Sequence, residues 1–313
     1  MNSGECSKFS VVVITVYFIM RKIQKNDVVC IVAYDAGAAS QIACYVATIP
    51  NKIIYSLGGP AISIFQSLFP RIENVSMLVA IAQSDIVICG SGWQSELEWE
   101  SIKHCRLIGK PIIACIDHWV NYRARFIRNN IECLPDNIWV FDEYARILAE
   151  KEFPSVNIIE QPNFYLVSQV KGIEEIDSHQ DLMNDSILYL LEPMRESWDG
   201  DRQAEFEALD LFTKKLGSLS AKRSVEIILK PHPSDQDGKY DDWLMGHKGL
   251  NIKLTRDSLI KAISRATIVV GCRTYAMVVA LFAGRRVYSS IPSYVKTQRL
   301  PHKTIIELDE LGH

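Results

Sequence analysis

Short apolar runs alternate with longer amphipathic stretches along the chain from residue 27 onward. In the first half these apolar runs are rich in β-branched residues, and a helical pattern follows each of them. The runs cover residues 27–33, 52–57, 85–90, 111–117 and 137–142. Continuous apolar strands that alternate with helices are typical of βαβ units, whose parallel sheet is buried on both faces. The first half therefore predicts a doubly wound α/β domain that ends near residue 165.

The second half repeats this alternation after a polar, acidic stretch at 171–186, which is predicted to be a linker or a connecting helix. Its apolar runs cover residues 187–193, 225–233, 250–255, 267–272 and 285–290. Segments 84–114 and 265–290 share one layout of strand, glycine, polar turn, helix, glycine with a basic residue, and strand. The expected fold class is therefore α/β, with two tandem Rossmann-like domains that face each other across a cleft.

The expected domain organisation has four parts. They are an N-terminal extension (1–23), a first Rossmann-like domain (24–168), a linker (169–186) and a second Rossmann-like domain (187–313). The extension contains an apolar run of eleven residues, 10–20, which is followed by basic residues. A membrane span needs about 20 apolar residues, and a signal peptide has its basic residues before the apolar run. Three alternatives stay open: a natural start at Met20, a segment that docks on the protein, or a segment that docks on a membrane surface.

Composition excludes several classes of protein. The 313 residues are 48 % hydrophobic and 23 % charged, which favours packed domains over disorder. A formal net charge of -3 argues against a nucleic-acid partner, because phosphate contacts need a basic surface. The eight cysteines form no C-x-x-C pair, and several lie in apolar runs, which favours a reducing cytoplasm over a disulfide framework. Neither the cysteines nor the seven histidines have metal-ligand spacing, so no metal is expected.

Polar residues follow five of the predicted strands, at the positions where open α/β sheets bind ligands. They lie in YDAG (34–37), GSGWQSE (90–96), DHW (117–119), KPHPSD (230–235) and GCRTY (271–275). A residue such as Asp35 or Ser91 either contacts a ligand or simply caps the next helix. The chain has neither G-x-G-x-x-G nor G-x-x-x-x-G-K-[ST], so neither a dinucleotide site nor a P-loop is expected.

The KPHPSD segment holds a histidine between two prolines. Pro231 and Pro233 fix the backbone and remove two hydrogen-bond donors, so neither an interior strand nor a helix continues through them. An imidazole at His232, with Lys230 before it and Ser234 after it, suits an anion such as a phosphate. The alternative is a loop histidine whose hydrogen bonds are satisfied within the protein.

The GCRTY segment supplies a second anion site. Arg273 and Thr274 lie between the end of a predicted strand and the start of a predicted helix. Free N–H groups and the helix dipole attract anions at such a start. Because His232 follows another strand of the same domain, these residues predict a clamp for the phosphates of a nucleotide.

KPHPSD and the later ATIVVGCRTYAMVVALFAGRRVYSS together resemble the donor half of GT-B glycosyltransferases. The likeness is greatest to bacterial sialyl- and Kdo-type transferases, which use CMP-activated sugars, and to the glycerol-phosphate polymerases of wall teichoic acid. In these families a His-Pro motif and a Ser/Thr motif at a helix start contact the phosphate of the donor. The resemblance implies that His232, Pro233 and Thr274 bind the donor nucleotide.

The same transferases carry an acidic motif after a strand of the first domain, and a carboxylate in it acts as general base towards the acceptor hydroxyl. The segment Asp117-His118-Trp119 occupies a similar place, with one acid and no glycine. The resemblance implies Asp117 as the base, with His118 second and Asp35 as the rival. Desolvation in a closing cleft raises the pKa of such a carboxylate towards the working pH.

Further contacts are expected around these groups. The acceptor is expected to contact Gly37, Ser91, Arg123 and Arg125, and the donor is expected to contact Glu192 and Arg195. Arg123, Arg125 and Arg128 follow the acidic motif on a predicted helix and form either a solvated face or a patch for an anionic acceptor. Glu192 binds the ribose or the base, or it only caps its loop, and Arg195 neutralises a carboxylate or a phosphate of the donor.

The function expected from these residues and the resemblance is an inverting, metal-independent glycosyltransferase of surface polysaccharide assembly. It would take a nucleotide sugar, such as a CMP-activated one, and a glycan or lipid-linked acceptor, and it would need no cofactor. The alternatives are a nucleotide-sugar hydrolase or 2-epimerase, a glycerophosphotransferase, or a non-catalytic nucleotide-sugar-binding homologue. A cytoplasmic location is expected, while peripheral contact with the inner face of the membrane and the oligomeric state stay open.

Overall fold

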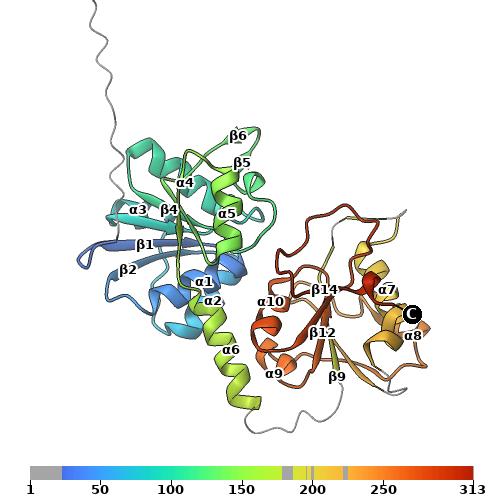
Figure 1. Ribbon diagram of the computed structural model, residues 1–313. Helices are drawn as coiled ribbons and strands as arrows, with labels where there is room; N and C mark the ends of the chain where they lie inside the picture. Colours follow the sequence, from blue (N-terminus) through green and yellow to red (C-terminus); the bar gives the residue numbers. More distant parts are fainter. Residues whose placement is uncertain (1–22, 178–185, 195, 199–200, 221–224, 313) are drawn as a thin grey trace, which may run out of the picture.

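The computed structural model describes residues 23–177, 186–194, 196–198, 201–220 and 225–312. Two parallel sheets of six strands each lie side by side, with helices packed around both (Figure 1). Alternate residues of one strand lie in different cores: Val29 and Ile31 pack on one face of the first sheet, and Cys30 and Val32 on the other. The prediction of an α/β fold with two Rossmann-like domains is confirmed.

The first sheet has the strand order β2-β1-β3-β4-β7-β8. Its strands are β1 (Val28–Ala33), β2 (Lys52–Leu57), β3 (Ile86–Cys89), β4 (Ile112–Cys115), β7 (Asn137–Val140) and β8 (Asn157–Glu160). Its helices are α1 (Ala36–Val46), α2 (Gly59–Leu68), α3 (Met77–Ala82), α4 (Leu97–Ile108) and α5 (Glu143–Glu152). From β1 the chain goes to β2 on one side and later to β3 on the other, so the strand order reverses between β1 and β3.

The second sheet has the strand order β11-β10-β9-β12-β13-β14. Its strands are β9 (Ser186–Leu190), β10 (Glu226–Lys230), β11 (Ile252–Leu254), β12 (Ile268–Gly271), β13 (Arg286–Ser289) and β14 (Ile306–Glu307). Its helices are α7 (Ala204–Leu219), α8 (Asp241–Gly246), α9 (Leu259–Ser264) and α10 (Tyr275–Phe282), and a 3-10 turn covers Leu308–Glu310. The strand order reverses between β9 and β12, and such sheets bind nucleotides at this point.

Helix α6 (Phe164–Asp177) joins the two halves of the chain. It contacts α1 of the first domain and both α9 and α10 of the second, and in Figure 1 it descends from the first domain beside the second. An ion pair of 2.6 Å between Asp177 Oδ2 and Arg285 Nη2 fixes its end to the second domain. The expected linker therefore begins inside a helix, and residues 178–185 lie outside the described part of the chain.

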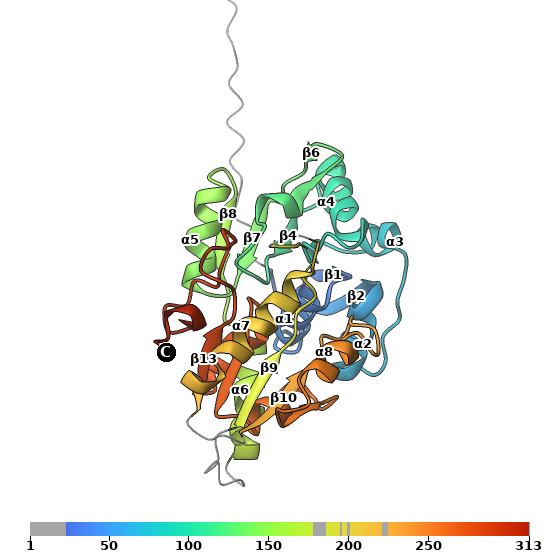
Figure 2. The ribbon, with the colours of Figure 1, turned by 90° about the vertical axis from the view of Figure 1, so that its right-hand side faces the viewer.

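The segment after β13 returns to the first domain. The backbone N–H of Asn121 donates to Gln298 Oε1 at 3.2 Å, and Leu300 packs against the first-domain core. The ring of His302 lies edge-on to Trp119 at 4.8 Å, and Figure 2 shows this last segment close to α5. The two domains are therefore joined by α6 and by this returning segment.

The predicted helix after the acidic motif is wrong. Residues Arg123–Phe126 form one 3-10 turn, and the hairpin β5 (Ile127–Arg128) and β6 (Ile131–Glu132) follows. Asn129 and Asn130 have φ of 50° and 62°, which is the backbone of a two-residue hairpin turn. Phe126 is fully buried, and this burial with the Asn-Asn turn overrides the helical pattern.

The N-terminal extension, apart from residue 23, lies outside the described part of the chain. Ile23 packs against the core of the first domain. Within the described ranges, no helix combines the length and the apolar composition that a membrane crossing needs.

Candidate functional site

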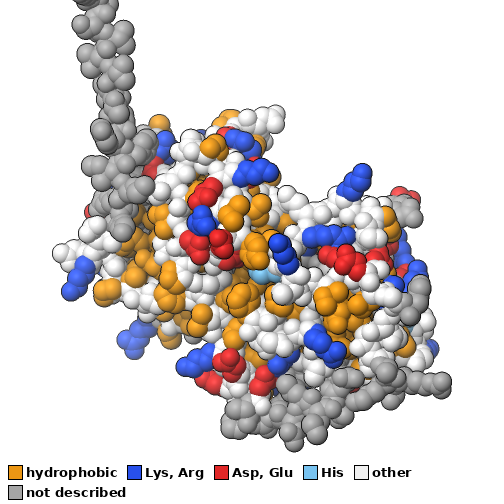
Figure 3. Space-filling view, in the orientation of Figure 1, with side chains coloured by type: hydrophobic (Ala, Val, Ile, Leu, Met, Phe, Trp, Pro, Cys, Tyr) orange, Lys and Arg blue, Asp and Glu red, His pale blue; other side chains and the backbone are white. Residues whose placement is uncertain are grey.

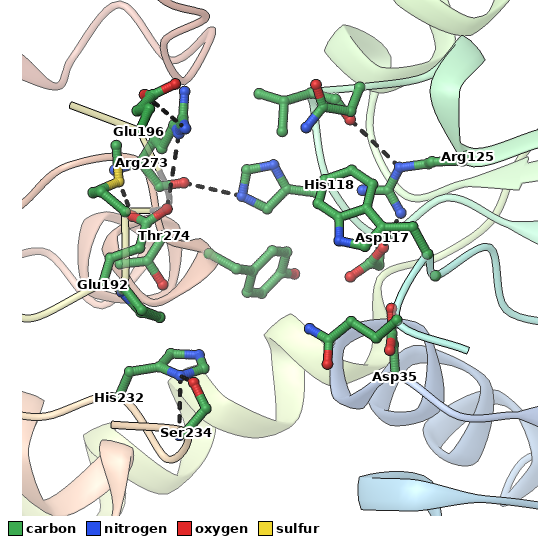
Figure 4. A pocket seen from close by; sticks show the side chains of 18 residues that line it. Asp35, Asp117, His118, Arg125, Glu192, Glu196, His232, Ser234, Arg273 and Thr274 are labelled. Atoms are coloured by element: carbon green, nitrogen blue, oxygen red, sulfur yellow. Dashed lines mark hydrogen bonds and ion pairs between the residues drawn. The ribbon is translucent and has the colours of Figure 1, made fainter. Parts of the chain in front are cut away.

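A cavity of about 550 Å³ lies between the two domains, beyond the carboxyl ends of the strands. Figure 3 shows a hollow between the two lobes, with a histidine side chain visible inside it. Its walls include Asp35 after β1, Gly92 and Trp93 after β3, Asp117 and His118 after β4, Glu192 after β9, His232 and Ser234 after β10, and Arg273 and Thr274 after β12. Both points of strand-order reversal therefore open onto one cavity, and Figure 4 shows their side chains on opposite walls.

On the second-domain wall, the ring of His232 is held in one tautomer. Its Nδ1 accepts the backbone N–H of Ser234 at 3.2 Å and lies 2.7 Å from Ser234 Oγ. The proton of the neutral ring is therefore on Nε2. Burial lowers the pKa of His232, so the ring is neutral near pH 7 and offers the Nε2–H as a donor on the side that faces the cavity (Figure 4).

A buried ion network holds the loop that carries this histidine. The carboxylate of Asp235 accepts the backbone N–H of His232 at 2.9 Å and pairs with Lys239 at 2.8 Å. Lys239 also pairs with Glu205 at 2.7 Å, and the other oxygen of Glu205 accepts the backbone N–H of Met194 at 3.1 Å. One network therefore fixes both the β10 loop and the β9 loop.

The start of α10 lies on the same wall. Thr274 precedes the helix in extended backbone, with φ of -71° and ψ of 147°, and lines the cavity. The backbone N–H of Arg273 donates to Glu192 at 3.0 Å, and its guanidinium pairs with Glu196 at 3.1 Å and donates to Thr297 at 2.5 Å. Burial raises the pKa of Glu192. The charge of Arg273 is therefore already paired within its own domain.

On the first-domain wall, Asp117 Oδ1 pairs with Arg125 Nη1 at 2.8 Å. Arg125 is buried and also donates to Ser91 Oγ at 3.3 Å, and Ser91 in turn donates to the carbonyl of Cys115 at 2.7 Å. A Cβ added at Gly37 would lie only 1.8 Å from Asp117 Oδ2. The second oxygen of Asp117 therefore lies against the first turn of α1, at a place that only glycine leaves open.

His118, which follows a strand of the first domain, forms a hydrogen bond to the second domain. Its Nδ1 accepts the backbone N–H of Trp119 at 2.9 Å, so its Nε2–H donates to the carbonyl of Arg273 at 2.9 Å. Burial lowers the pKa of His118 to about 4, and the ring is neutral. Both ring nitrogens have partners, so His118 holds the domains together in this arrangement.

An aromatic contact lies beside this bond. The ring of Trp119 stacks on Tyr275 at 5.6 Å and 7°, and its indole N–H donates to Asp142 at 2.9 Å. The hydroxyl of Tyr275 accepts from Gln41 at 3.1 Å and from Asn163 at 3.0 Å. The sequence gives no signal for this contact, because its partners are far apart along the chain.

Glu98, on α4, is a buried carboxyl beneath the first-domain wall. Its side chain is 1 % exposed, and it accepts the backbone N–H groups of Tyr34 at 2.9 Å and Gly92 at 2.6 Å. Burial raises the pKa of Glu98 to about 7. A Cβ at Gly90 would lie 2.1 Å from Glu98 Oε1, so the glycines of the GSG segment are the signal that could have revealed it.

Comparison with solved structures identifies the fold of the chain. No protein-family model matches the chain, and no curated protein sequence matches it. The solved UDP-GlcNAc 2-epimerase from Neisseria meningitidis, bound to UDP-GlcNAc, superposes with a TM-score of 0.55 at 12 % identity, over 80 % of this chain and 78 % of that one. Anabaena Alr3699/HepE in complex with UDP and glucose superposes with a TM-score of 0.51 at 9 % identity, over 84 % and 80 %. The chain has the GT-B fold. The predicted GT-B resemblance is therefore confirmed at the level of the fold.

The GT-B cleft does not bring together all the expected residues. Arg123 pairs with Glu132 at 2.7 Å and lies on the surface, outside the cavity lining. Lys230 donates to the carbonyl of Asp257 at 2.6 Å and, like Pro233, lines neighbouring depressions instead. Ser91 is buried beneath the wall. The side chains of Arg123, Lys230 and Ser91 are already hydrogen-bonded or ion-paired within the protein.

Two expected residues remain to be placed. Gly37 lines an adjoining cavity of about 320 Å³, which shares Asp117, His232 and Thr274 with the main one. Arg195 lies outside the described residues. Among the residues that the structure describes, no three or more His, Cys, Asp or Glu side chains are grouped in a way that could hold a metal ion.

Proposed function

We propose that this protein is a glycosyltransferase that binds a nucleotide sugar on its second domain and the acceptor on its first. The observation that carries the proposal is the cavity onto which both points of strand-order reversal open. One wall offers hydrogen-bond donors, namely the Nε2–H of His232 and the start of α10, and the other offers the carboxylates of Asp35 and Asp117. The solved complexes of similar fold hold UDP-GlcNAc or UDP, which supports a nucleotide sugar as the donor class.

The proposed donor site places the phosphate next to His232 and Thr274. A neutral N–H donor and the positive end of a helix stabilise an anion without a metal ion. Glu192, whose pKa is raised by burial, is suited to hydrogen-bond a ribose hydroxyl. Because Arg273 is paired with Glu196, we propose that it orders the loop rather than binding the phosphate directly.

In the proposed reaction the acceptor oxygen attacks the anomeric carbon and forms a new C–O bond. The bond between that carbon and the phosphate oxygen breaks, and its electron pair leaves with the nucleotide. The acceptor proton goes to a carboxylate on the first-domain wall, either Asp117 or Asp35. Attack from the wall opposite the leaving group inverts the anomeric centre. If Asp117 is the base, Asp117→Asn abolishes transfer while Asp35→Asn lowers it, and the reverse order assigns the base to Asp35.

Nucleotide binding tests the proposal directly. CMP, CDP, UDP and GDP are added in turn and the thermal unfolding midpoint is measured. A nucleotide at 100 times its Kd adds about 2.7 kcal/mol to the unfolding free energy. The matched control is His247→Ala, since His247 stacks on Trp243 away from the cavity lining and its removal should keep the shift. The clamp is refuted if no nucleotide raises the midpoint, or if His232→Ala keeps the full increase.

A second candidate is a hydrolase or 2-epimerase on the same fold, because the structure from N. meningitidis is of a 2-epimerase. Product analysis separates the candidates once a nucleotide sugar that binds is known. Transfer gives a glycosylated acceptor, hydrolysis gives a free sugar, and epimerisation gives an altered sugar without an acceptor. Binding without any of these products would indicate a non-catalytic homologue.

A further inference from the structure

Glu98 connects two loops of the first-domain wall through backbone hydrogen bonds. The N–H of Tyr34 precedes Asp35 at the end of β1, and the N–H of Gly92 precedes Trp93 after β3. Asp35 and Trp93 both line the cavity, whereas Glu98 is buried behind them. A single side chain therefore holds the backbone on both sides of the first-domain reversal point.

The packing around this carboxyl leaves little freedom. A Cβ at Gly90 would lie 2.1 Å from Glu98 Oε1, and a Cβ at Gly92 would lie 1.7 Å from Asp35 Oδ2. Glu98 therefore packs against Gly90 and Asp35 packs against Gly92 of the same GSG segment, at positions that a side chain would block.

The charged and titratable groups that face Glu98 are those of Asp35, Asp117, Cys89 and Cys115. The two carboxylates disfavour a third negative charge nearby. Burial raises the pKa of both thiols well above the ordinary value, so they stay neutral. The nearby cation Arg125 forms its ion pair with Asp117 rather than with Glu98. Burial raises the pKa of Glu98 most, the hydrogen bond from the Tyr34 backbone opposes it, and the charge of Asp35 raises the pKa further.

We propose that Glu98 is a positioning residue of the acceptor wall, which holds Asp35 and Trp93 at the cavity through the backbone of Tyr34 and Gly92 and whose protonation depends on the charge of Asp35. Its role in sugar transfer rests on the proposed function, but the coupling itself does not. When Glu98 carries a proton, one of its oxygens becomes a donor and the two loops are held less tightly. The geometry of the acceptor wall therefore changes with the protonation of a group that no substrate touches.

Carboxyl carbon NMR of the full chain, labelled with 13C-glutamate, tests the coupling without any substrate. We expect the Glu98 carboxyl to titrate with a midpoint near pH 7, in line with its pKa of about 7, and its signal is distinguished from that of Glu192, whose pKa is also raised, by assignment with Glu98→Gln. That signal should vanish in Glu98→Gln and persist in the matched control Glu100→Gln, which removes an exposed carboxylate of the same helix that pairs with Lys103 at 3.3 Å. In Asp35→Asn the midpoint should fall by about half a pH unit or more, because a like charge has been removed.

The indole N–H signal of Trp93, assigned with Trp93→Phe, reports on the wall itself. It should shift with the same midpoint in the wild type and should not shift in Glu98→Gln, while the indole of Trp243 in the second domain stays constant. The proposal is overturned if the signal that disappears in Glu98→Gln titrates below about pH 6, or if neither the Asp35→Asn midpoint nor the Trp93 signal moves.

Nucleotide binding separates this proposal from the proposed function. If Glu98 positions the acceptor wall alone, Glu98→Gln keeps the nucleotide-induced thermal shift of the wild type. It then changes the pH profile of transfer and raises the KM for the acceptor. If the wild type binds no nucleotide, the proposed function fails while the titration still decides the coupling. Loss of the nucleotide shift in Glu98→Gln, with the fold intact, contradicts a role limited to the acceptor wall.

Discussion

At the scale of single residues, the same local device produces two different outcomes. In both His232 and His118 the Nδ1 accepts a backbone N–H from a residue just downstream, so the proton is on Nε2. The Nε2–H of His118 is used by the carbonyl of Arg273 across the domain boundary. The Nε2–H of His232 faces the cavity and is suited to a ligand. The direction of the ring, rather than its tautomer, therefore separates the domain contact from the proposed binding group.

Gly37→Ala tests whether the position of Asp117 matters. The new methyl group would overlap Asp117 Oδ2, so the carboxylate has to turn away from α1 and from Arg125. We expect the unfolding free energy to fall by about 1–3 kcal/mol and transfer to be lost, while nucleotide binding is kept. In the control, Gly217→Ala, the methyl group meets nothing within 4 Å, and stability should rise by about 0.5–1 kcal/mol. Equal transfer by Gly37→Ala and the wild type would show that Asp117 has no part in the reaction.

Sequence alone could predict residues whose position is set by their neighbours in the chain. Pro231 and Pro233 restrict the segment around His232, and that ring does line the cavity. Glu98 is not predicted, because a glutamate in an amphipathic helix is normally solvated and its partners, Tyr34 and Gly92, come from two other loops. The only signal for it in the sequence is the pair of glycines in the GSG segment, against which it packs. The pairing of Arg273 with Glu196 likewise depends on tertiary structure.

At the scale of secondary structure, the carboxyl ends of the strands position the site, and caps fix the helices that follow. Asp142 is the N-cap of α5 and accepts the backbone N–H of Ala145 at 2.7 Å. The same carboxylate accepts the indole N–H of Trp119. One residue therefore fixes both the start of a helix and the ring that stacks on the second domain.

Asp142→Ala should lower the unfolding free energy by more than the loss of an N-cap alone would. An N-cap contributes about 0.5–2 kcal/mol, and leaving the buried indole donor of Trp119 without a partner adds about 1–3 kcal/mol. Ser258 caps α9 through the backbone N–H of Lys261 and has the role of a cap alone, so Ser258→Ala is the matched control. Chemical denaturation measures both variants. Similar losses of stability for the two would mean that the bond to Trp119 contributes nothing.

The order of elements could be predicted where apolar runs were long and continuous, as they are for β1 and β12. Strand β8 was not predicted because its residues are only partly buried and its apolar run is short. The helix expected after Asp117 failed because tertiary burial of Phe126 and a turn at Asn129 and Asn130 decide the backbone there.

At the scale of the whole molecule, the two domains meet through contacts that depend on neutral His118. A proton on Nδ1 of His118 would face the backbone N–H of Trp119, which is also a donor, so the bond between them would be lost. Trp119 stacks on Tyr275 of the second domain, so this loss would reach the domain contact. Acid should therefore weaken the contact between the domains before it unfolds either one.

The pH dependence of stability tests this link. The pKa of His118 is about 4 in the folded chain and about 6.5 when the chain is unfolded, so between these values the unfolded state binds the extra proton. His118 therefore lowers stability as the pH falls from 6.5 towards 4, by about 3 kcal/mol. The contribution of Glu98 to stability has the opposite pH dependence. Its pKa of about 7 in the folded chain lies above the unfolded value of 4.5, so Glu98 lowers the unfolding free energy as the pH rises from 4.5 to 7.

A comparison of variants separates these two opposing contributions. The unfolding free energies of His118→Gln and the wild type are measured with urea at pH 5 and pH 7.5. Relative to the wild type, the variant should be more stable at pH 5 than at pH 7.5, because it has no imidazole to protonate. The Glu98→Gln variant should change the wild-type profile in the other direction, with its relative gain at pH 7.5. Small-angle scattering of the wild type should show a larger radius of gyration near pH 4.5 than at pH 7.5, since the domain contact is weakened first. A difference between His118→Gln and the wild type that is the same at both pH values would exclude His118 as the acid-sensitive link between the domains.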